Sequence, residues 1–433
     1  MRALARRISA SWLLLPLLVL AFGFGAGFAL RAVIGGGGDD GSRAGAGAPT
    51  SAGPPRGAAR ERSFLSRVVP PPAGSLRGAR PPAVVTRLVR AMPAEQKVAQ
   101  LMMVGFGGGD ATAPVFKRIR RRTYGALMFG ERNYASAKQL RTLSAELQAQ
   151  VTRSKTTQPF LGALQQGGEW NALSALPPDR APAETGNVAA AADDASATAR
   201  TFKRLGLNAI LGPSLEVGSE DGGAMGTRAY SDESDQVAAF AQTGVEQYTR
   251  AGILAAPGRF PGLGAAAIAP EDGPPNVGLS LEDLRRRDLV PFRAAVRAGA
   301  PAVLVGPGLY VTDDFVVPAS LSKAVSTNLL RGQIGFRGIA IADDLTSAAI
   351  TTTTPTPDAA VQSIAAGVDM VYVPGPEAIV GQTYDALLAA LRRGRLKRQR
   401  VDEAVTRILV AKSDLGLLRK RAVPPRSPAA GAP

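Results

Sequence analysis

The chain has 433 residues and 45% of them are hydrophobic, so it is long enough to bury the core of one large domain or two ordinary ones. It contains neither cysteine nor histidine. Disulfides, thiolate or imidazole metal ligands, cysteine nucleophiles and imidazole acids or bases are therefore excluded, and neither a metal site nor a cofactor is predicted.

The first element that we expect is a membrane anchor. Three arginines precede an uncharged apolar stretch from Trp12 to Leu30, which is about one bilayer crossing at ~1.5 Å per residue. The apolar part of a secretory signal peptide is usually shorter, ~7–15 residues. We expect residues 1–34 to form an uncleaved single-pass anchor in the cell membrane, with the rest of the chain outside the cytoplasm. A cleaved signal followed by a secreted domain is the alternative.

Two flanking segments differ in composition from the rest of the chain. Residues 35–82 are dominated by Gly, Ala, Pro, Ser and Arg, and such a segment buries too little apolar surface to offset the entropy of ordering it. It is predicted to be a flexible linker. Residues 420–433 are similar and are predicted to be a disordered tail. The folded domain is expected over residues 83–419.

Between these flanks, eight short apolar runs alternate with segments of helical spacing, such as 137–147 and 281–296. This alternation predicts an α/β fold with a mostly parallel sheet covered by helices. Eight repeats favour a closed (β/α)8 TIM-type barrel over an open sheet. The runs are Leu101–Phe106, Gly125–Phe129, Phe160–Leu164, Leu207–Leu211, Gly252–Ala256, Ala302–Val305, Gly338–Ala342 and Asp369–Val373.

The net charge is +16, and basic residues form runs at 117–122, 285–287 and 392–400. Runs of this kind are compatible with nucleic acid, anionic lipid or an acidic wall polymer. They also suit solvated helix faces and helix C-termini, where arginine complements the helix dipole. No aromatic interleaving or nucleic-acid motif accompanies them, so we expect solvated helix faces and no nucleic-acid partner.

Several local patterns occur in the order of one known family. The segment 92–106 reads MPAEQKVAQLMMVGF, and it is followed by GTRAY at 226–230, RFPGLG at 259–264, PASLS at 318–322 and the segment 335–345. This ordered set resembles glycoside hydrolase family 3, in particular its single-domain β-N-acetylhexosaminidases, over nearly all of the predicted domain. The resemblance implies a retaining glycosidase, in which a carboxylate attacks the anomeric carbon and an acid protonates the leaving oxygen.

The resemblance also implies roles for particular residues. The family's nucleophile falls on Asp343, directly after the seventh apolar run, and Asp344 is expected to be a cap or a supporting carboxylate. The alternative is that either aspartate only caps a helix at 345–350. Arg228 matches the arginine that holds the sugar in the family, for which a guanidinium fork is well suited. The alternative is a surface arginine on a glycine-rich loop.

At several sugar contacts the sequence departs from the family. A Lys-His pair is replaced by Gly258 and Arg259, which makes Arg259 the candidate contact in its place. An acidic sugar ligand on the third strand has become Gln165, and a histidine after the sixth corresponds to Pro307. The sugar-binding ring has thus lost charge and donors, while the nucleophile position keeps its carboxylate.

The general acid is also replaced. The family's Asp-x-His pair, whose histidine is the acid/base, falls on residues 269–271. Glu271, or its neighbour Asp272, is a chemically sensible substitute, because a carboxyl group with a raised pKa protonates the leaving group in most retaining glycosidases. An exposed acidic loop is the alternative.

Two functions are therefore expected. The first is a retaining hydrolase of β-N-acetylhexosaminidase type, weakened or inactive, acting on amino-sugar glycans such as peptidoglycan. The second is a non-catalytic pseudoenzyme that binds glycan or a protein partner at the cell envelope. They differ in whether the carboxyl group of Glu271 approaches that of Asp343 to about 5–5.5 Å, as a retaining mechanism needs. A phosphorylase is a weaker idea, because no phosphate-binding loop supports it.

Overall fold

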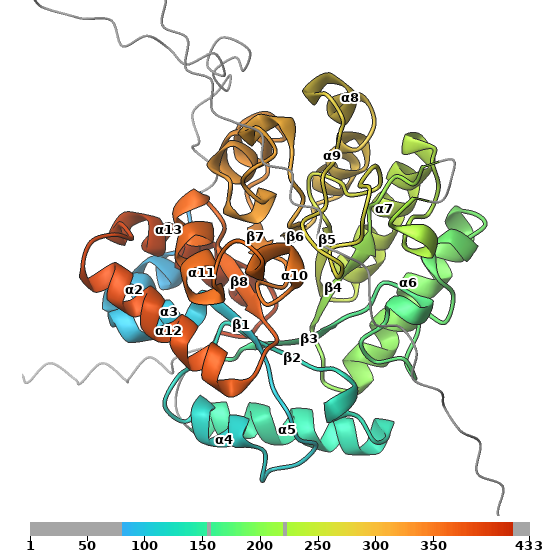
Figure 1. Ribbon diagram of the computed structural model, residues 1–433. Coiled ribbons are helices and arrows are strands. Elements are labelled where there is room, and N and C mark those ends of the chain that lie inside the picture. The colour runs from blue at the N-terminus through green and yellow to red at the C-terminus, as the bar shows by residue number, and fades with distance from the viewer. Residues whose placement is uncertain (1–79, 154–156, 220–222, 419–433) are drawn as a thin grey trace, which may run out of the picture. The chain divides into compact units, whose positions relative to one another are not determined.

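A computed structural model describes residues 80–153, 157–219 and 223–418, and shows eight parallel strands with helices around them (Figure 1). All eight predicted strands are confirmed. The predicted anchor at Trp12–Leu30, nearly all of the predicted linker and the predicted tail lie outside the described residues. The strands are β1 (Met102–Gly105), β2 (Ala126–Met128), β3 (Phe160–Leu164), β4 (Ala209–Ser214), β5 (Leu254–Gly258), β6 (Ala302–Val305), β7 (Ile339–Ala342) and β8 (Met370–Val373).

The strands form one sheet in the order β5-β4-β3-β2-β1-β8-β7-β6. A continuous ladder does not join β5 to β6. Instead Phe260, just beyond β5, bridges Val305 at the end of β6, and its backbone N–H donates to the carbonyl of Leu304 at 2.7 Å. The sheet is therefore a nearly closed barrel. We call the end where the strands begin the amino face, and the end where they finish the carboxyl face.

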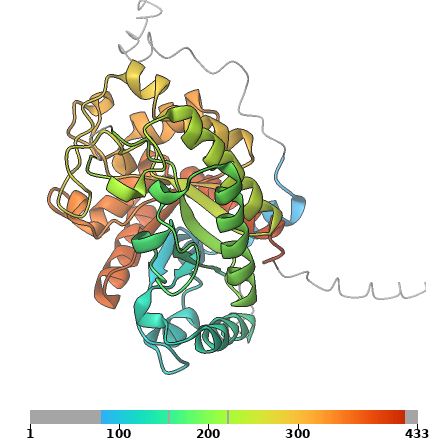
Figure 2. The same cartoon turned by 90° about the vertical axis from the view of Figure 1, so that its right-hand side faces the viewer.

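Helices cover the outside of the sheet, and the turned view shows how they surround the strands (Figure 2). Within the described residues, no helix is long and apolar enough to span a bilayer. The α-helices are α2 (Ala83–Ala91), α3 (Ala94–Gln100), α4 (Pro114–Ile119), α5 (Ala137–Arg153), α6 (Val188–Arg204), α7 (Ser234–Arg250), α8 (Leu281–Arg286), α9 (Leu289–Arg297), α10 (Ala348–Thr351), α11 (Thr356–Ala366), α12 (Glu377–Arg392) and α13 (Arg398–Asp414). A π-helix, η7 (Ala324–Gln333), precedes β7, and short 3-10 turns are η1 (Glu131–Asn133), η2 (Gly168–Trp170), η3 (Pro182–Glu184), η4 (Gly226–Arg228), η5 (Val311–Asp313) and η6 (Ala319–Leu321).

Two helix predictions need correction. The segment 281–296 forms two helices, because Arg287 turns away to donate to the carbonyl of Val217 at 2.8 Å and pairs with the buried Asp288 at 3.1 Å. The helix predicted at 345–350 is a turn followed by α10, which begins at Ala348 with Ser347 as its N-cap residue. Ahead of α10, the side chain of Asp344 accepts from the backbone N–H of Thr346 at 2.7 Å and holds the turn.

The core has two apolar clusters that share strands. In β6, Ala302 and Leu304 belong to the larger cluster, while Val303 and Val305 belong to the smaller one. This alternation follows from the two-residue period of a strand. Both clusters lie wholly within residues 85–411. Residues 80–418 thus contain all eight strands, the covering helices and a complete core, and they form a domain that can fold on its own.

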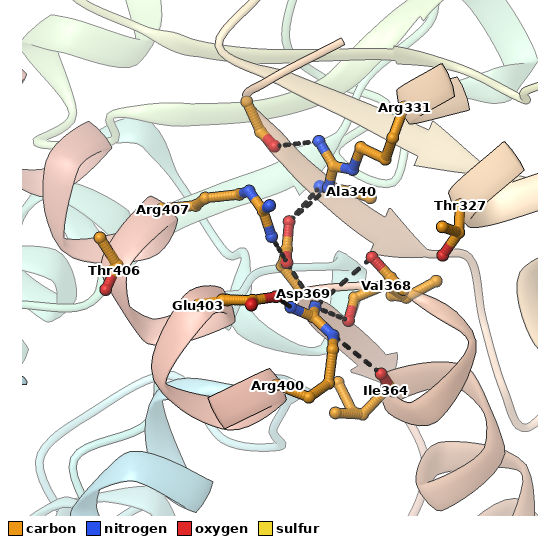
Figure 3. A network of polar contacts seen from close by, with 12 residues as sticks. Thr327, Arg331, Ala340, Ile364, Val368, Asp369, Arg400, Glu403, Thr406 and Arg407 are labelled. Atoms are coloured by element: carbon orange, nitrogen blue, oxygen red, sulfur yellow. Dashed lines mark hydrogen bonds and ion pairs between the residues drawn. The ribbon is translucent and has the colours of Figure 1, made fainter. Parts of the chain in front are cut away.

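A buried carboxylate joins three elements at the amino face (Figure 3). Asp369, directly before β8, accepts from Arg331 of η7 at 2.6 Å and from Arg400 and Arg407 of α13 at 2.6 and 2.9 Å. Its carboxylate also accepts from the backbone N–H of Ala340 in β7 at 3.0 Å. Burial alone would raise the pKa of Asp369, but the three arginines hold it below its ordinary value.

Candidate active site

Asp343 lies at the carboxyl face, directly after β7. Its backbone N–H donates to the carbonyl of Val305 at 2.9 Å, which continues the pairing of β7 with β6. The residue is 6% exposed. Barrel enzymes carry their chemistry on the segments that leave the strands, and the strand holds this carboxylate rigidly at that end. The position is the one expected for the family's nucleophile.

Asp344 has a different surrounding. Its Oδ1 accepts from the backbone N–H of Thr346 at 2.7 Å and from the Thr346 hydroxyl at 2.6 Å. Burial raises the pKa of Asp344 to about 6, against the lowering effect of those hydrogen bonds. Asp344 therefore closes the turn after β7, and Asp343 is left to face the other functional groups.

Arg259 holds Asp343. It follows β5 through a cis peptide bond, is 3% exposed, and donates from Nε to Oδ2 of Asp343. Burial alone would lower the pKa of Arg259, but Asp343 and the buried Glu216 together raise it above its ordinary value. Its Nη1 is buried and has no hydrogen-bond partner among the described residues. Arg259 thus contacts the candidate nucleophile and keeps one donor for a ligand.

Glu216 is a site residue that the sequence analysis missed. It lies after β4, is fully buried, and accepts from the backbone N–H groups of Arg259 at 2.8 Å and Leu263 at 2.5 Å. Burial raises the pKa of Glu216, while Arg259 and the two backbone donors oppose the shift. Glu216 therefore fixes the backbone of the β5 loop. Its only sequence signal is a single acidic residue between Leu215 and Val217.

Arg228 is buried, at 4% exposed, so the alternative of a surface arginine is wrong. Its Nε donates to Oε1 of Gln166 at 3.0 Å, its Nη1 lies 3.3 Å from Oε1 of Glu271, and its Cζ lies 4.2 Å from the centre of the Trp170 ring. Burial, followed by repulsion from Arg259, lowers the pKa of Arg228 to about 10. Arg228 remains protonated at neutral pH and links the loops after β3, β4 and β5.

Glu271 lies at the rim of this cluster, and its side chain is 57% exposed. Its Oε1 pairs with Arg228, as Asp343 pairs with Arg259. The two candidate carboxylates therefore each hold one of two buried arginines. The neighbouring Asp272 is exposed, and no side-chain contact joins it to either arginine within the described residues. Of the two acidic residues in this loop, Glu271 is the one that faces the site.

Gln165, which was predicted to contact the sugar, holds its own loop. Its Nε2 donates to the carbonyls of Leu173, Leu176 and Pro177 at 2.9–3.1 Å, and its Oε1 accepts from the N–H of Leu173 at 3.3 Å. No donor of this amide is left for a ligand. The next residue, Gln166, reaches Arg228, and its Nε2 is buried and has no partner among the described residues. The geometry thus gives Gln166 the place expected for Gln165.

No group of three or more acidic residues in the described part of the chain is arranged to hold a metal ion. The site consists of two arginines, the three carboxylates of Asp343, Glu271 and Glu216, a glutamine amide and the Trp170 ring. Arginine forks and glutamine amides can donate to sugar hydroxyl or N-acetyl oxygens, and an aromatic ring can pack against a sugar. A carboxylate at the end of β7 can act as a nucleophile.

Comparisons with known proteins agree with this geometry. The model of the glycosyl hydrolase family 3 N-terminal domain matches residues 94–411. A β-hexosaminidase from Stenotrophomonas maltophilia is 30% identical over 326 residues, which are 68% of this chain and 92% of that protein. The solved structure of a family 3 β-N-acetylglucosaminidase from a Paenibacillus species superposes on this chain with a TM-score of 0.73 at 31% sequence identity. The superposition covers 76% of this chain and 63% of that structure. A β-N-acetylhexosaminidase from Beutenbergia cavernae gives a TM-score of 0.68 at 25% identity, over 74% of this chain and 99% of its own. The chain belongs to glycoside hydrolase family 3, and within that family it is similar to the β-N-acetylhexosaminidases.

Proposed function

We propose that the protein is a slow retaining glycoside hydrolase of β-N-acetylhexosaminidase type, with amino-sugar glycans such as peptidoglycan fragments as its substrates. The observation that carries this proposal is that two carboxylates at the carboxyl face, Asp343 and Glu271, pair with the buried Arg259 and Arg228, respectively. The relatives named as β-hexosaminidases support the substrate class.

In the first step, Asp343 attacks the anomeric carbon, and the bond from that carbon to the leaving oxygen breaks as Glu271 donates its proton to this oxygen. In the second step, water attacks the glycosyl carbon, Glu271 takes the proton from the water, and Asp343 leaves as a carboxylate. Arg228, Gln166 and the free Nη1 of Arg259 are available to hold the substrate's oxygens.

Two features of the site predict a low rate. When Asp343 forms the covalent bond it loses its charge, and the buried Arg259 then loses its ion-pair partner, which is costly for a buried cation. Glu271 is largely exposed and contacts a cation, so it lacks the apolar surrounding that makes a carboxyl group a good proton donor at neutral pH.

The test compares two substrates that differ in their need for an acid. We expect the chain to hydrolyse an aryl N-acetyl-β-glucosaminide with a good leaving group, and a chitobiose-type disaccharide more slowly. Glu271→Gln should lower kcat/KM for the disaccharide by ~10²–10⁴-fold and kcat/KM for the aryl substrate much less, because only the disaccharide needs the acid in the first step. The kcat for the aryl substrate should fall, because attack by water in the second step needs Glu271 as the base. Azide should restore turnover of the aryl substrate by this variant, because a small anion attacks the glycosyl intermediate without needing a base.

Two controls complete this test. Asp272→Asn changes an exposed neighbour that does not contact either arginine, and it should leave both rates unchanged. Asp343→Asn should abolish both. Efficient hydrolysis by Asp343→Asn would overturn the assignment of roles, and equal losses from Glu271→Gln and Asp272→Asn would remove Glu271 from the mechanism.

A non-catalytic glycan-binding barrel is the second candidate. The buried ion pair between Arg259 and Asp343 favours it, because this pair already satisfies the carboxylate that a nucleophile must free. In this case calorimetric titration with the disaccharide should show binding without any turnover of either substrate. Arg228→Ala should remove the binding, whereas Asp343→Asn should not.

We also propose that the domain lies outside the cytoplasmic membrane, held by the apolar stretch Trp12–Leu30. Fractionation of cells that express the full chain should place it with the membranes, and protease added to the periplasmic or outer side should digest it. A mature chain that starts after residue 30 would select the secreted alternative. Recovery of the full-length chain in the cytosol would contradict both.

A further inference from the structure

Charges are distributed unevenly between the two faces of the barrel. Five segments at the amino face, 117–125, 200–208, 293–301, 331–338 and 389–398, carry basic residues as their only charged residues, whereas other segments there contain acids such as Glu246 and Asp369. At the carboxyl face, the segments that leave the strands carry most of the loop acids of the domain. These acids include Asp110, Glu131, Glu169, Asp179, Glu184, Asp232, Glu233, Glu271, Asp272, Asp313 and Asp314.

Helix dipoles explain only part of this pattern. A cation in the last turn of a helix is stabilised by the dipole, which accounts for one or two basic residues at each helix end. It does not account for the loops beyond, such as 120–122 after α4 and 393–397 between α12 and α13, which are also basic. Arg118, Arg122 and Arg392 pair with Glu377, Asp385 and Glu95 from other segments. Among the described residues, the other cations of these two loops form no ion pair, and the dipole does not account for that.

The charges of the amino face are exposed and mostly unpaired. Helices α6 and α7 pack side by side (Figure 2). An open groove between them is lined by Arg200, Lys203, Arg204 and Arg250. All four are exposed. Within the described residues none of them forms an ion pair, and the guanidinium groups of Arg204 and Arg250 bond only to neutral neighbours at 3.0 Å. A surface whose exposed charges are all positive and form no ion pairs within the protein can attract an external anion.

Further cations extend this surface around the amino face. Lys117, Arg120 and Arg121 lie at the end of α4, and Arg297 and Arg337 lie before β6 and β7. Arg393, Arg395 and Lys397 lie between α12 and α13, Arg398 is the first residue of α13, and all of these side chains are exposed. The cations are thus spread over the whole end of the barrel. A broad distribution suits a planar anionic surface better than a single polymer strand lying in one groove.

The composition and the course of the chain point to lipid. Every charged side chain of the five segments is basic, and their aromatic residues, Tyr124, Phe202 and Phe336, are buried, so these segments offer no exposed platform for stacking nucleic-acid bases. The described chain also starts at this end. Helix α2, near its first residue, packs against α13, and α13 binds Asp369 at the start of β8.

We propose that the amino face of the barrel docks on the anionic phospholipid headgroups of a membrane, with Asp343 and Arg228 facing away from the bilayer. The attraction is electrostatic, because cations within about a Debye length, ~8–10 Å, of anionic lipid are drawn to it and salt weakens the effect. The proposal rests on the charge distribution and not on the proposed hydrolysis, so either can fail alone.

The test uses residues 80–418, the complete domain, with vesicles of phosphatidylcholine alone or mixed with phosphatidylglycerol. Co-sedimentation should occur with the mixed vesicles only and should decrease as salt is added. A groove variant, with Arg200→Gln, Lys203→Gln, Arg204→Gln and Arg250→Gln, should lower the partition coefficient at least ~10-fold. A matched control removes four exposed cations from the carboxyl-face half, with Arg132→Gln, Lys138→Gln, Arg141→Gln and Lys323→Gln, and should bind nearly as well as the unchanged domain.

Circular dichroism of both variants checks that they fold, and neither variant touches the candidate active site. Equal weakening by the two variants would show that only net charge matters and would overturn the docking face. Failure to bind the anionic vesicles at low salt would overturn the proposal. If the domain bound a nucleic acid or a soluble polyphosphate but not the vesicles, the amino face would be a site for another polyanion, and the proposal of lipid docking would also be overturned.

Discussion

At the scale of single residues, Lys412 is the most unusual group in the domain. It is fully buried in α13, its Nζ donates to Oε1 of Gln100 at 2.7 Å, and it lies 5.2 Å from the centre of the Phe160 ring. No carboxylate pairs with it within the described residues. Burial lowers the pKa of Lys412 from 10.5 to about 7. The unfolded chain therefore binds this proton more tightly than the folded domain does.

This difference predicts a pH dependence of stability. Between pH 7 and about 10 the unfolded state holds more protons, so the free energy of unfolding should rise with pH by up to about 1.4 kcal/mol per unit through this residue. Below pH 7 the contribution should level off. Lys412→Met removes this pH-dependent contribution. In urea unfolding, the free energy of unfolding of the unchanged domain should therefore rise with pH relative to that of the variant.

Lys397→Met, at an exposed lysine, is the control and should give a pH profile parallel to that of the unchanged domain. Lys412→Met also leaves the Oε1 of Gln100 without its donor, but that cost does not change with pH. Parallel profiles for Lys412→Met and the unchanged domain would show that Lys412 keeps its ordinary proton affinity in the fold.

At the scale of elements, Asp369 fastens η7, β7 and α13 to the start of β8 (Figure 3). Asp369→Asn keeps the shape of the side chain but leaves three arginines without their shared counter-charge. Breaking a buried ion pair by removing one partner typically costs about 3–5 kcal/mol, so urea unfolding at neutral pH should show a loss of this size.

Asp414→Asn changes an exposed acid at the end of the same helix and should alter the free energy of unfolding by less than about 0.5 kcal/mol. Because the pKa of Asp369 is lowered in the folded state, its stabilisation is present above the ordinary pKa and is lost as pH falls through the folded value. The two aspartate variants should therefore approach each other in stability under strongly acidic conditions. Equal stability at neutral pH would mean that the arginine cluster contributes nothing to the fold.

Elements were predicted well where the signal is local. All eight strands follow from short apolar runs, because both faces of a parallel strand are buried and its residues are apolar throughout. The break between α8 and α9 was not predicted, since it depends on contacts of Arg287 with its neighbour Asp288 and with Val217, which is 70 residues away in the chain. The active site shows the same limit. Asp343 and Arg228 follow from motifs, whereas Glu216 acts on backbone groups 43 and 47 residues away, and Gln166 is told from Gln165 only by the direction of its side chain.

At the scale of the whole molecule, the shared strands tie the two core clusters into one unit. Successive residues of β6 belong to different clusters, and Phe260 bridges β5 to β6 where the ladder is interrupted. If a shared strand detached from one cluster, the residues that it contributes to the other cluster would also be exposed. We therefore expect residues 80–418 to unfold in one cooperative transition, with equal calorimetric and van't Hoff enthalpies, although the domain is larger than most two-state proteins.

Limited proteolysis of the full chain gives an independent measure of the same cooperativity. Cleavage that requires global opening should leave one resistant core from about residue 80 to about residue 418, and its yield should follow the stability measured in urea. Asp369→Asn should speed the loss of the whole core, because the cluster joins elements from β7 to α13. A stable fragment that ends in the middle of the chain, or two separate calorimetric transitions, would show that the clusters fold independently and that the bridge at Phe260 does not couple them.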